Sequence, residues 1–152
     1  MSSIDELIHQ RVPADERLAL LAFADSGVIE VTRRELDSRI AATARALQQD
    51  GLGEGDRILL LAANRIEWIV LALATLRAGG VIVPVDTQMG AEDLAHVFND
   101  AAPWRIVVDE ASALGLPQSV PRERIHRLED LGTAASEGAD DRREREPAAP
   151  VA

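Results

Sequence analysis

The stretch Asn64–Asp86 reads NRIEWIVLALATLRAGGVIVPVD and joins an apolar helix to an apolar strand. Asn64 is a favourable N-cap residue, and Glu67 follows three positions later. This spacing predicts a capping box, in which each side chain bonds the other residue's backbone amide. From Trp68 to Leu76 only Thr75 is polar, so we expect the helix to be buried on more than one face.

The second half of the stretch predicts a buried strand. Gly79 and Gly80 permit the left-handed turn with which helices commonly end. Residues 81–85 then form a β-branched run interrupted only by Pro84, which is typical of a strand covered on both faces. A helix followed directly by such a strand is half of a βαβ unit, so the fold should contain a parallel sheet.

The remaining pattern extends this unit in both directions. Thr32 and Glu35 predict a second capping box, and Gly51 ends the helix that it opens. In chain order we expect a short helix at 3–9, a hairpin of strands 18–24 and 28–31, a helix from 32 to Gly51, a strand at 57–61, the stretch described above, a helix from Ala91 that ends before Pro103, a strand at 106–108 and a weaker strand at 124–127.

Strands that alternate with helices predict an α/β fold with an open, mainly parallel sheet and flanking helices. The strands at 57–61, 81–85 and 106–108 should form its centre, with the hairpin at an edge or apart. We expect residues 1–131 to form this α/β unit. Residues 132–152 are rich in alanine, proline, arginine and acidic residues, so we expect a disordered tail or linker.

Composition excludes several function classes. The net charge of −10 argues against nucleic acids and anionic membrane surfaces, which attract basic proteins. No apolar run approaches the roughly 20 residues of a membrane span, and no signal segment opens the sequence. The sequence contains no cysteine and no lysine, so neither thiolate nor lysine chemistry is available. We expect a soluble, cytoplasmic protein.

Ligands of open parallel sheets bind beyond the carboxyl ends of the strands. In this sequence those ends are Ala62-Ala63-Asn64, Pro84–Gly90 and Asp109-Glu110. Asp86 is the most suggestive acid among them, although fixing a turn explains it better than contacting a ligand. These loops are the places to look for a small-molecule site.

No residue presents a convincing catalytic, cofactor-binding or metal-binding pattern. The segment Gly51–Gly55 is glycine-rich, but it runs from a helix into a strand, whereas phosphate loops run from a strand into a helix. The other candidates have simpler structural explanations as solvated, capping or core residues: the histidines His9, His96 and His126, the acid pairs Glu92-Asp93, Glu129-Asp130 and Asp140-Asp141, and the tryptophans Trp68 and Trp104. We therefore predict no catalytic, cofactor or metal residue.

Several motifs resemble those of the adenylate-forming, or AMP-binding, superfamily, and the likeness covers about Ile4 to Asp109. They are Val31–Leu36 for T-Y-x-E-L with arginine at the usual tyrosine, Gly55–Ile58 for G-D-R-V, Asn64–Glu67 for N-x-x-E, Leu76–Asp86 for L-K-A-G-A-x-x-V-P-L-D, and Ala91–Leu94 for A-E-R-L. Acyl-CoA synthetases, luciferases and peptide-synthetase adenylation domains belong to this superfamily. The resemblance implies ATP-dependent activation of a carboxylic acid as an acyl-adenylate, usually followed by transfer to a thiol.

The resemblance also shows what these 152 residues lack. The family's Ser/Thr/Gly-rich phosphate loop, its magnesium-associated glutamate, its ribose-binding aspartate and its C-terminal lysine have no counterpart here. ATP, magnesium and CoA are implied for the full-length family, and we expect this chain to bind none of them. It resembles the N-terminal part of an acyl-CoA synthetase or related ligase, as a truncated product or an isolated subdomain.

Three hypotheses follow. The chain is an N-terminal fragment of an acyl-activating ligase, inactive alone and completed by the rest of the ligase, with a place in fatty acid metabolism. Alternatively it is a stand-alone protein-interaction module that retains the subdomain fold and acts through self-association or an unidentified partner. The third hypothesis is an unrelated α/β nucleotide binder, which the missing phosphate loop disfavours. A fragment that ends at a subdomain border should expose an apolar patch.

Overall fold

The computed structural model describes Glu6 and residues 14–131. The helix expected at 3–9 and the tail at 132–152 lie outside the described residues, apart from Glu6. The elements are β1 (Leu18–Ala24), β2 (Gly27–Thr32), α2 (Arg33–Gln49), β3 (Arg57–Leu61), α3 (Ile66–Arg77), β4 (Val81–Pro84), α4 (Ala91–Ala101), β5 (Arg105–Val108), α5 (Glu110–Ala113), a 3-10 turn (Arg122–Arg124) and β6 (Ile125–Arg127).

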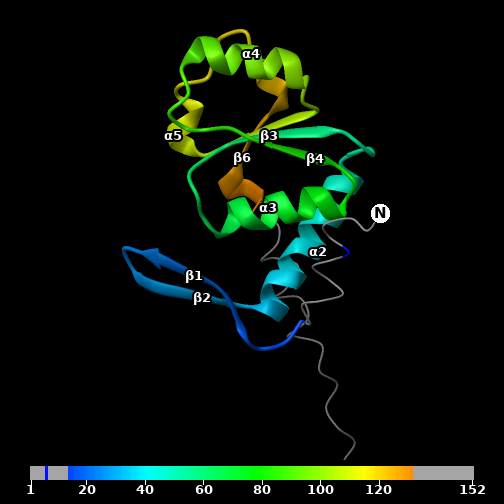
Figure 1. Ribbon diagram of the computed structural model, residues 1–152, viewed down its shortest axis with the longest axis vertical. Helices are drawn as coiled ribbons and strands as arrows, with labels where there is room; N and C mark the ends of the chain where they lie inside the picture. Colours follow the sequence, from blue (N-terminus) through cyan, green and yellow to red (C-terminus); the bar gives the residue numbers. More distant parts are fainter. Residues whose placement is uncertain (1–5, 7–13, 132–152) are drawn as a thin grey trace, which may run out of the picture.

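A four-stranded parallel sheet in the order β4-β3-β5-β6 forms the centre of the described chain. Helix α4 covers one face of the sheet, and α3 covers the other, with α2 packed beyond α3 (Figure 1). This confirms the predicted α/β architecture with flanking helices. Strand β3 has a neighbour on each side, and its alternating side chains fill the core on both faces of the sheet.

That alternation is visible residue by residue. Ile58 and Leu60 belong to the apolar cluster beneath α2 and α3, whereas Leu59 and Leu61 belong to the cluster beneath α4. All four side chains are at most 4% exposed. The continuous apolar sequence of this strand therefore reports burial on both faces, as predicted.

Helix α2 begins and ends as its sequence indicates. The Thr32 hydroxyl accepts a hydrogen bond from the Glu35 amide at 3.2 Å, and the Glu35 carboxylate accepts one from the Thr32 amide at 3.0 Å. At the other end Gly51 has a φ of +99°, which a residue with a side chain rarely adopts. Leu52 then packs into the core, so this capping box and this glycine stop are confirmed.

Helix α3 is buried as predicted, but its expected cap is wrong. Six of its twelve residues are buried, and it lies between the sheet and α2. Its N-cap residue is Arg65, with no side-chain hydrogen bond at the cap, so Asn64 and Glu67 form no capping box. Glu67 instead lies 3.3 Å from the Arg65 guanidinium. An ion pair has replaced the local cap because long-range contacts, described below, hold the chain just before the helix.

Strand β4 departs further from its prediction. Its sequence is the most strand-like in the chain, yet Val81 is 42% exposed, Pro84 is exposed, and the two residues between them are partly buried. The reason is its position, since among the described strands β4 pairs only with β3 and forms an edge of the sheet. The expectation that β4 is central and covered on both faces is therefore wrong for this chain.

Strands β1 and β2 form a separate antiparallel hairpin, which was the second of the two placements predicted for it. The turn is at Asp25 and Ser26, and Gly27 has a φ of +125°. The hairpin extends to one side of the body, next to the N-terminal end of α2 (Figure 1).

Candidate functional site

The carboxyl edge of the parallel sheet brings two of the three predicted loops together. Asp109 follows β5, and its Oδ2 accepts a hydrogen bond from the backbone amide of Ala63, which follows β3, at 2.7 Å. Its Oδ1 accepts one from the Ser112 amide at 2.8 Å and caps α5. The side chain is 7% exposed. Asp109 thus joins the ends of two adjacent strands.

The protonation state of Asp109 follows from these contacts. Burial alone would raise the pKa of this carboxyl group. The hydrogen bonds from Ser112 and Ala63, together with the positive charge of Arg65, outweigh burial and lower its pKa below 3.8. Asp109 is therefore ionised at neutral pH, and both of its oxygens are already engaged by backbone amides. A carboxylate with a lowered pKa is a poor general base.

Arg65 completes the polar cluster at this edge. Its Nη1 lies 2.7 Å from Glu129 Oε1, and its Nε lies 3.3 Å from Glu67 Oε2. The other oxygen of Glu129 is buried and has no hydrogen-bond partner among the described residues. The guanidinium is shared between two carboxylates, so it neutralises local charge and ties β3 to the segment after β6. Sequence reasoning missed Arg65, because its partner Glu129 is 64 residues away and no local pattern connects them.

The third predicted loop follows β4 and makes a turn. The Asp86 carboxylate accepts a hydrogen bond from the Gln88 amide at 2.9 Å, and the Asp86 carbonyl accepts one from the Met89 amide at 3.1 Å. Asp86 is exposed. These bonds give it the turn-fixing role that the sequence favoured over a ligand contact.

The glycine-rich segment after α2 is a turn with its own bonding. The Gly53 amide donates to Asp56 Oδ2 at 2.8 Å, and the Gly55 amide donates to the Gly79 carbonyl at 2.9 Å. An anion-binding loop needs several free amides that point at one place. Here the Gly53 amide is bonded to Asp56 and the Gly55 amide to the Gly79 carbonyl, and the Asp56 carboxylate lies in the segment, so this segment does not suit a triphosphate.

The remaining candidate residues stay apart within the described chain. His96 is exposed on α4, and Glu92 and Asp93 lie in the first turn of that helix. Trp68 and Trp104 pack against the apolar cluster, which supports their prediction as core residues. His9 and the pair Asp140-Asp141 lie outside the described residues. Across Glu6 and residues 14–131, no three His, Cys, Asp or Glu side chains gather as metal ligands would.

His126 lies on β6, near the ion pair between Arg105 and Asp50. Burial lowers the pKa of this histidine, and the positive charge of Arg105 lowers it further, while Asp50 and Asp130 oppose the shift. Arg105 is 8% exposed, donates to Asp50 at 3.1 Å and lies 4.3 Å from the centroid of the Trp104 ring. The histidine is therefore a neutral structural residue near pH 7.

A small hollow lies beside this group, between α2 and the end of the described chain. It has a volume of about 50 Å³. Ligand pockets usually measure about 300–1,000 Å³, so a nucleotide or an acyl group does not fit here. The lining residues are Ala42, Thr43, Ala46, Leu47, Asp50, Arg105 and Leu131.

The described chain also contains no helix that is both long enough and apolar enough to span a bilayer. At the carboxyl edge of the sheet, Asp109, Arg65 and Glu129 form a set of polar contacts that we call the carboxyl-edge clamp. It joins the ends of β3 and β5 to the segment after β6. The prediction that no residue of this chain is catalytic or binds a cofactor remains a prediction.

Comparison with known proteins identifies the family. The sequence pattern of the family described as AMP-binding enzyme matches residues 10–151. The 3-hydroxybenzoate/4-hydroxybenzoate–CoA ligase of Thauera aromatica is 32% identical over 125 residues, which are 81% of this chain and 23% of that ligase. The long-chain-fatty-acid–CoA ligase of Escherichia coli is 32% identical over 108 residues, which are 70% of this chain and 19% of that enzyme.

Solved structures agree in fold. ATP-bound MatB from Rhodopseudomonas palustris superposes with a TM-score of 0.72 and 25% identity, over 88% of this chain and 27% of MatB. The N-terminal subdomain of Klebsiella oxytoca NpsA, in complex with 3-hydroxybenzoyl-AMSN, gives 0.74 at 22% identity over the whole of this chain and 35% of that one.

The chain spans about a quarter of the length of the curated acyl-CoA ligases that it matches first. The matched residues include β3, α3, β4 and the carboxyl-edge clamp. The match to the family covers most of the sequence, so this chain belongs to the AMP-binding enzyme family.

Proposed function

We propose that this chain is the N-terminal scaffold of an ATP-dependent acyl-activating ligase, and that it is inactive alone. The complete enzyme would convert a carboxylate to an acyl-adenylate and then to an acyl thioester. The observation that carries this proposal is the family match over residues 10–151, in a chain that spans about a quarter of its ligase relatives. The family match also excludes the third hypothesis, an unrelated nucleotide binder.

The chemistry of the described residues supports inactivity. Both oxygens of Asp109 accept hydrogen bonds from backbone amides, and Arg65 is shared between two carboxylates. The Gly53 amide donates to Asp56 within its turn, and the Gly55 amide donates to the Gly79 carbonyl. These groups are therefore engaged within the protein, which supports the proposal that they do not bind ATP or magnesium. We infer that ATP, magnesium and CoA bind to the parts that full-length relatives carry beyond this quarter.

The acid that is activated is a carboxylic acid of a kind that the relatives process. Their names include hydroxybenzoates and long-chain fatty acids, so both an aromatic acid and a fatty acid belong in the assay. We propose that the chain acts in acyl-CoA formation in the cytoplasm, with fatty acid metabolism as one setting.

A fusion tests the proposal. Residues 1–131 would replace the matched segment of the Thauera aromatica ligase, and acyl-adenylate formation from ATP and hydroxybenzoate would be measured. The proposal predicts activity in the fusion and none in the ligase that lacks the segment. A fusion that is folded by circular dichroism, yet forms no acyl-adenylate, contradicts it.

The second candidate function is a stand-alone interaction module. It is favoured by the apolar side chains exposed on the hairpin, which include Leu21, Phe23 and Val28. An interaction module would bind a partner unrelated to ligases through that surface. Acyl-adenylate formation and the labelling experiment described below together separate the two functions, because one measures ligase activity and the other measures whether a ligase remainder covers the hairpin.

A further inference from the structure

The β1–β2 hairpin has two apolar faces, and one of them packs against the body except at Ile29, which is 43% exposed. Paired residues of an antiparallel hairpin point to the same face. Leu20 pairs with Val31 and Ala22 pairs with Ile29. Val31 is fully buried, and Leu20 and Ala22 pack against the apolar cluster beneath α2 and α3. This inner face attaches the hairpin to the body.

The opposite face, which we call the outer face, consists of Leu21, Phe23, Val28 and Glu30. Leu21 pairs with Glu30, and Phe23 pairs with Val28. Leu21 is 46% exposed, Val28 is 55% exposed and Phe23 is 81% exposed. A strand with one face in water normally alternates apolar with polar residues, so three large apolar side chains on this face indicate a surface that is meant to be covered.

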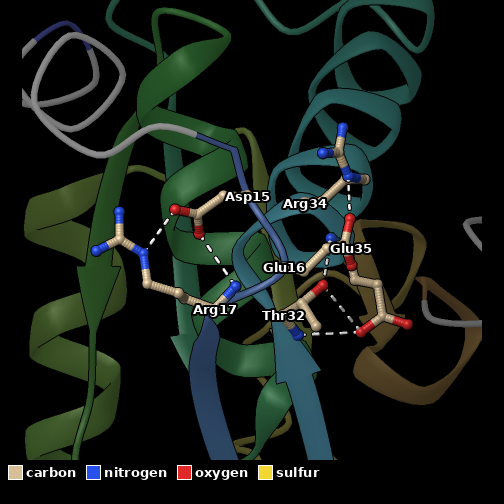
Figure 2. Close-up of polar contacts among 6 residues, drawn as sticks. All are labelled: Asp15, Glu16, Arg17, Thr32, Arg34 and Glu35. Carbon is tan, nitrogen blue, oxygen red and sulfur yellow. Dashed lines mark hydrogen bonds and ion pairs between the residues drawn. The ribbon is translucent and has the colours of Figure 1, made fainter.

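The base of the hairpin is fixed, so the outer face is held in a defined direction. Figure 2 shows Asp15 accepting hydrogen bonds from the Arg17 amide at 3.1 Å and from Arg17 Nε at 2.6 Å. Arg34 at the start of α2 forms an ion pair with Glu16. The Arg34 amide also donates to the Asp15 carbonyl at 3.0 Å. These contacts tie the segment before β1 to the helix after β2.

The size of the outer face restricts what covers it. A stable interface between proteins buries about 800 Å² on each partner, and three side chains supply only part of that area. A contact between the outer faces of two copies is therefore too small to hold a dimer by itself. A larger polypeptide that also touches other surfaces of this chain can bury the area that a stable interface requires. About three-quarters of each full-length relative lies outside the segment matched here.

We propose that the outer face of the β1–β2 hairpin is a docking surface for the remaining part of an adenylate-forming ligase. This inference rests on the proposed function and adds to it the residues through which the scaffold and the remainder are joined. The docked partner covers Leu21, Phe23 and Val28 with apolar side chains of its own.

Cysteine labelling tests the proposal directly, because the chain contains no cysteine of its own. Val28→Cys places a near-isosteric thiol on the outer face, and Leu114→Cys is the matched control. Leu114 is 91% exposed at the end of α5, beside the cluster beneath α4 and away from the hairpin. Each variant would be treated with a maleimide, with and without the Thauera aromatica ligase from which the matched quarter has been removed, and modification of this chain would be followed by mass spectrometry.

The proposal predicts that saturating remainder slows modification of Val28→Cys by about tenfold or more and leaves Leu114→Cys unchanged. Phe23→Thr keeps a residue suited to strands and should weaken binding of the remainder by about tenfold or more. Equal slowing at both cysteines, no slowing at either, or full binding by Phe23→Thr overturns the proposal. Slowing that depends on the concentration of this chain alone, with a dimer mass by light scattering, assigns the surface to a second copy and also overturns it.

The same mixture keeps this inference separate from the proposed function. Protection of Val28→Cys without acyl-adenylate formation refutes the proposed function and leaves the docking surface intact. Acyl-adenylate formation without protection refutes the docking surface and leaves the proposed function intact.

Discussion

Asp109 connects the ends of β3 and β5 through two hydrogen bonds to backbone amides. An asparagine at this position can accept from only one of the two amides with its single carbonyl oxygen, and its amide group faces the other. We expect Asp109→Asn to lower the free energy of unfolding by roughly 1–3 kcal/mol, because one of the two amides loses its acceptor in a partly buried site. Urea denaturation followed by circular dichroism measures the change.

Asp86→Asn is the matched control for Asp109→Asn. Asp86 is also an acid that follows a strand, but it is exposed and makes one side-chain hydrogen bond, to Gln88. Its replacement should change the free energy of unfolding by no more than about 0.5 kcal/mol. Equal losses in the two variants would show that the carboxyl-edge clamp does not stabilise the sheet.

His126 should make stability depend on pH between neutrality and mild acid. Burial and Arg105 lower its pKa below 6.5 in the folded state, so the unfolded chain binds the proton more readily. Stability is therefore complete above about pH 6.5 and falls as the pH drops toward the folded pKa. The lowered pKa of Asp109 acts separately, because stability from that carboxylate is lost only as the pH falls below about 4.

Urea midpoints at about pH 7.5 and about pH 5.5 measure the effect of His126. The wild-type midpoint should fall between these two pH values, and His126→Gln, which does not titrate, should lose less. A decrease of the same size in His126→Gln would assign the pH dependence to other groups.

The capping box of α2 is the local device that fixes where the hairpin ends and the helix begins. Thr32 and Glu35 satisfy each other's backbone amides there (Figure 2). Thr32→Ala should lower the free energy of unfolding by about 1 kcal/mol, the usual value of an N-cap side chain. The midpoint temperature of thermal unfolding, compared between Thr32→Ala and the wild type, measures this loss. Ser38→Ala, at an exposed position inside the same helix, should be neutral or slightly stabilising.

The two predicted capping boxes show how far a local pattern can be trusted. Thr32 and Glu35 cap α2 as predicted, and within the part of the chain that the structure describes no distant side chain bonds them. Asn64 and Glu67 have the same spacing, but Asp109 accepts the Ala63 amide, and Arg65, which binds the distant Glu129, also pairs with Glu67. The helix therefore begins after Arg65. A pattern four residues long cannot report contacts made from 40 or more residues away.

The burial of strand β4 also depends on contacts that its own sequence does not reveal. Its β-branched run correctly predicts a parallel strand, and its register against β3 places Val81 opposite Arg57 and Pro84 opposite Leu60. The same run cannot reveal which strands lie on each side of it. Among the described strands it is an edge, so Val81 is exposed. The sequence of β4 favours burial on both faces, but among the described strands only β3 lies beside it.

Over the chain as a whole, the fold was predictable and the exposed surface only partly so. Order and spacing of the motifs indicated the α/β architecture and the family, both of which the structure and the comparisons support. An exposed apolar patch was expected of a fragment that ends at a subdomain border, but its position was not predicted. Locating it on the hairpin required the pairing register, because only the register shows that Leu21, Phe23 and Val28 share one face.

The central claim is that this chain contributes scaffold and that the chemistry of acyl activation resides in the rest of the ligase. The most direct test is release of pyrophosphate from ATP by the purified chain in the presence of magnesium and either hydroxybenzoate or a long-chain fatty acid. The account predicts no acid-dependent release from the chain alone, and release from the fusion with the Thauera aromatica remainder under the same conditions. Acid-dependent pyrophosphate release by the unaided chain would contradict it.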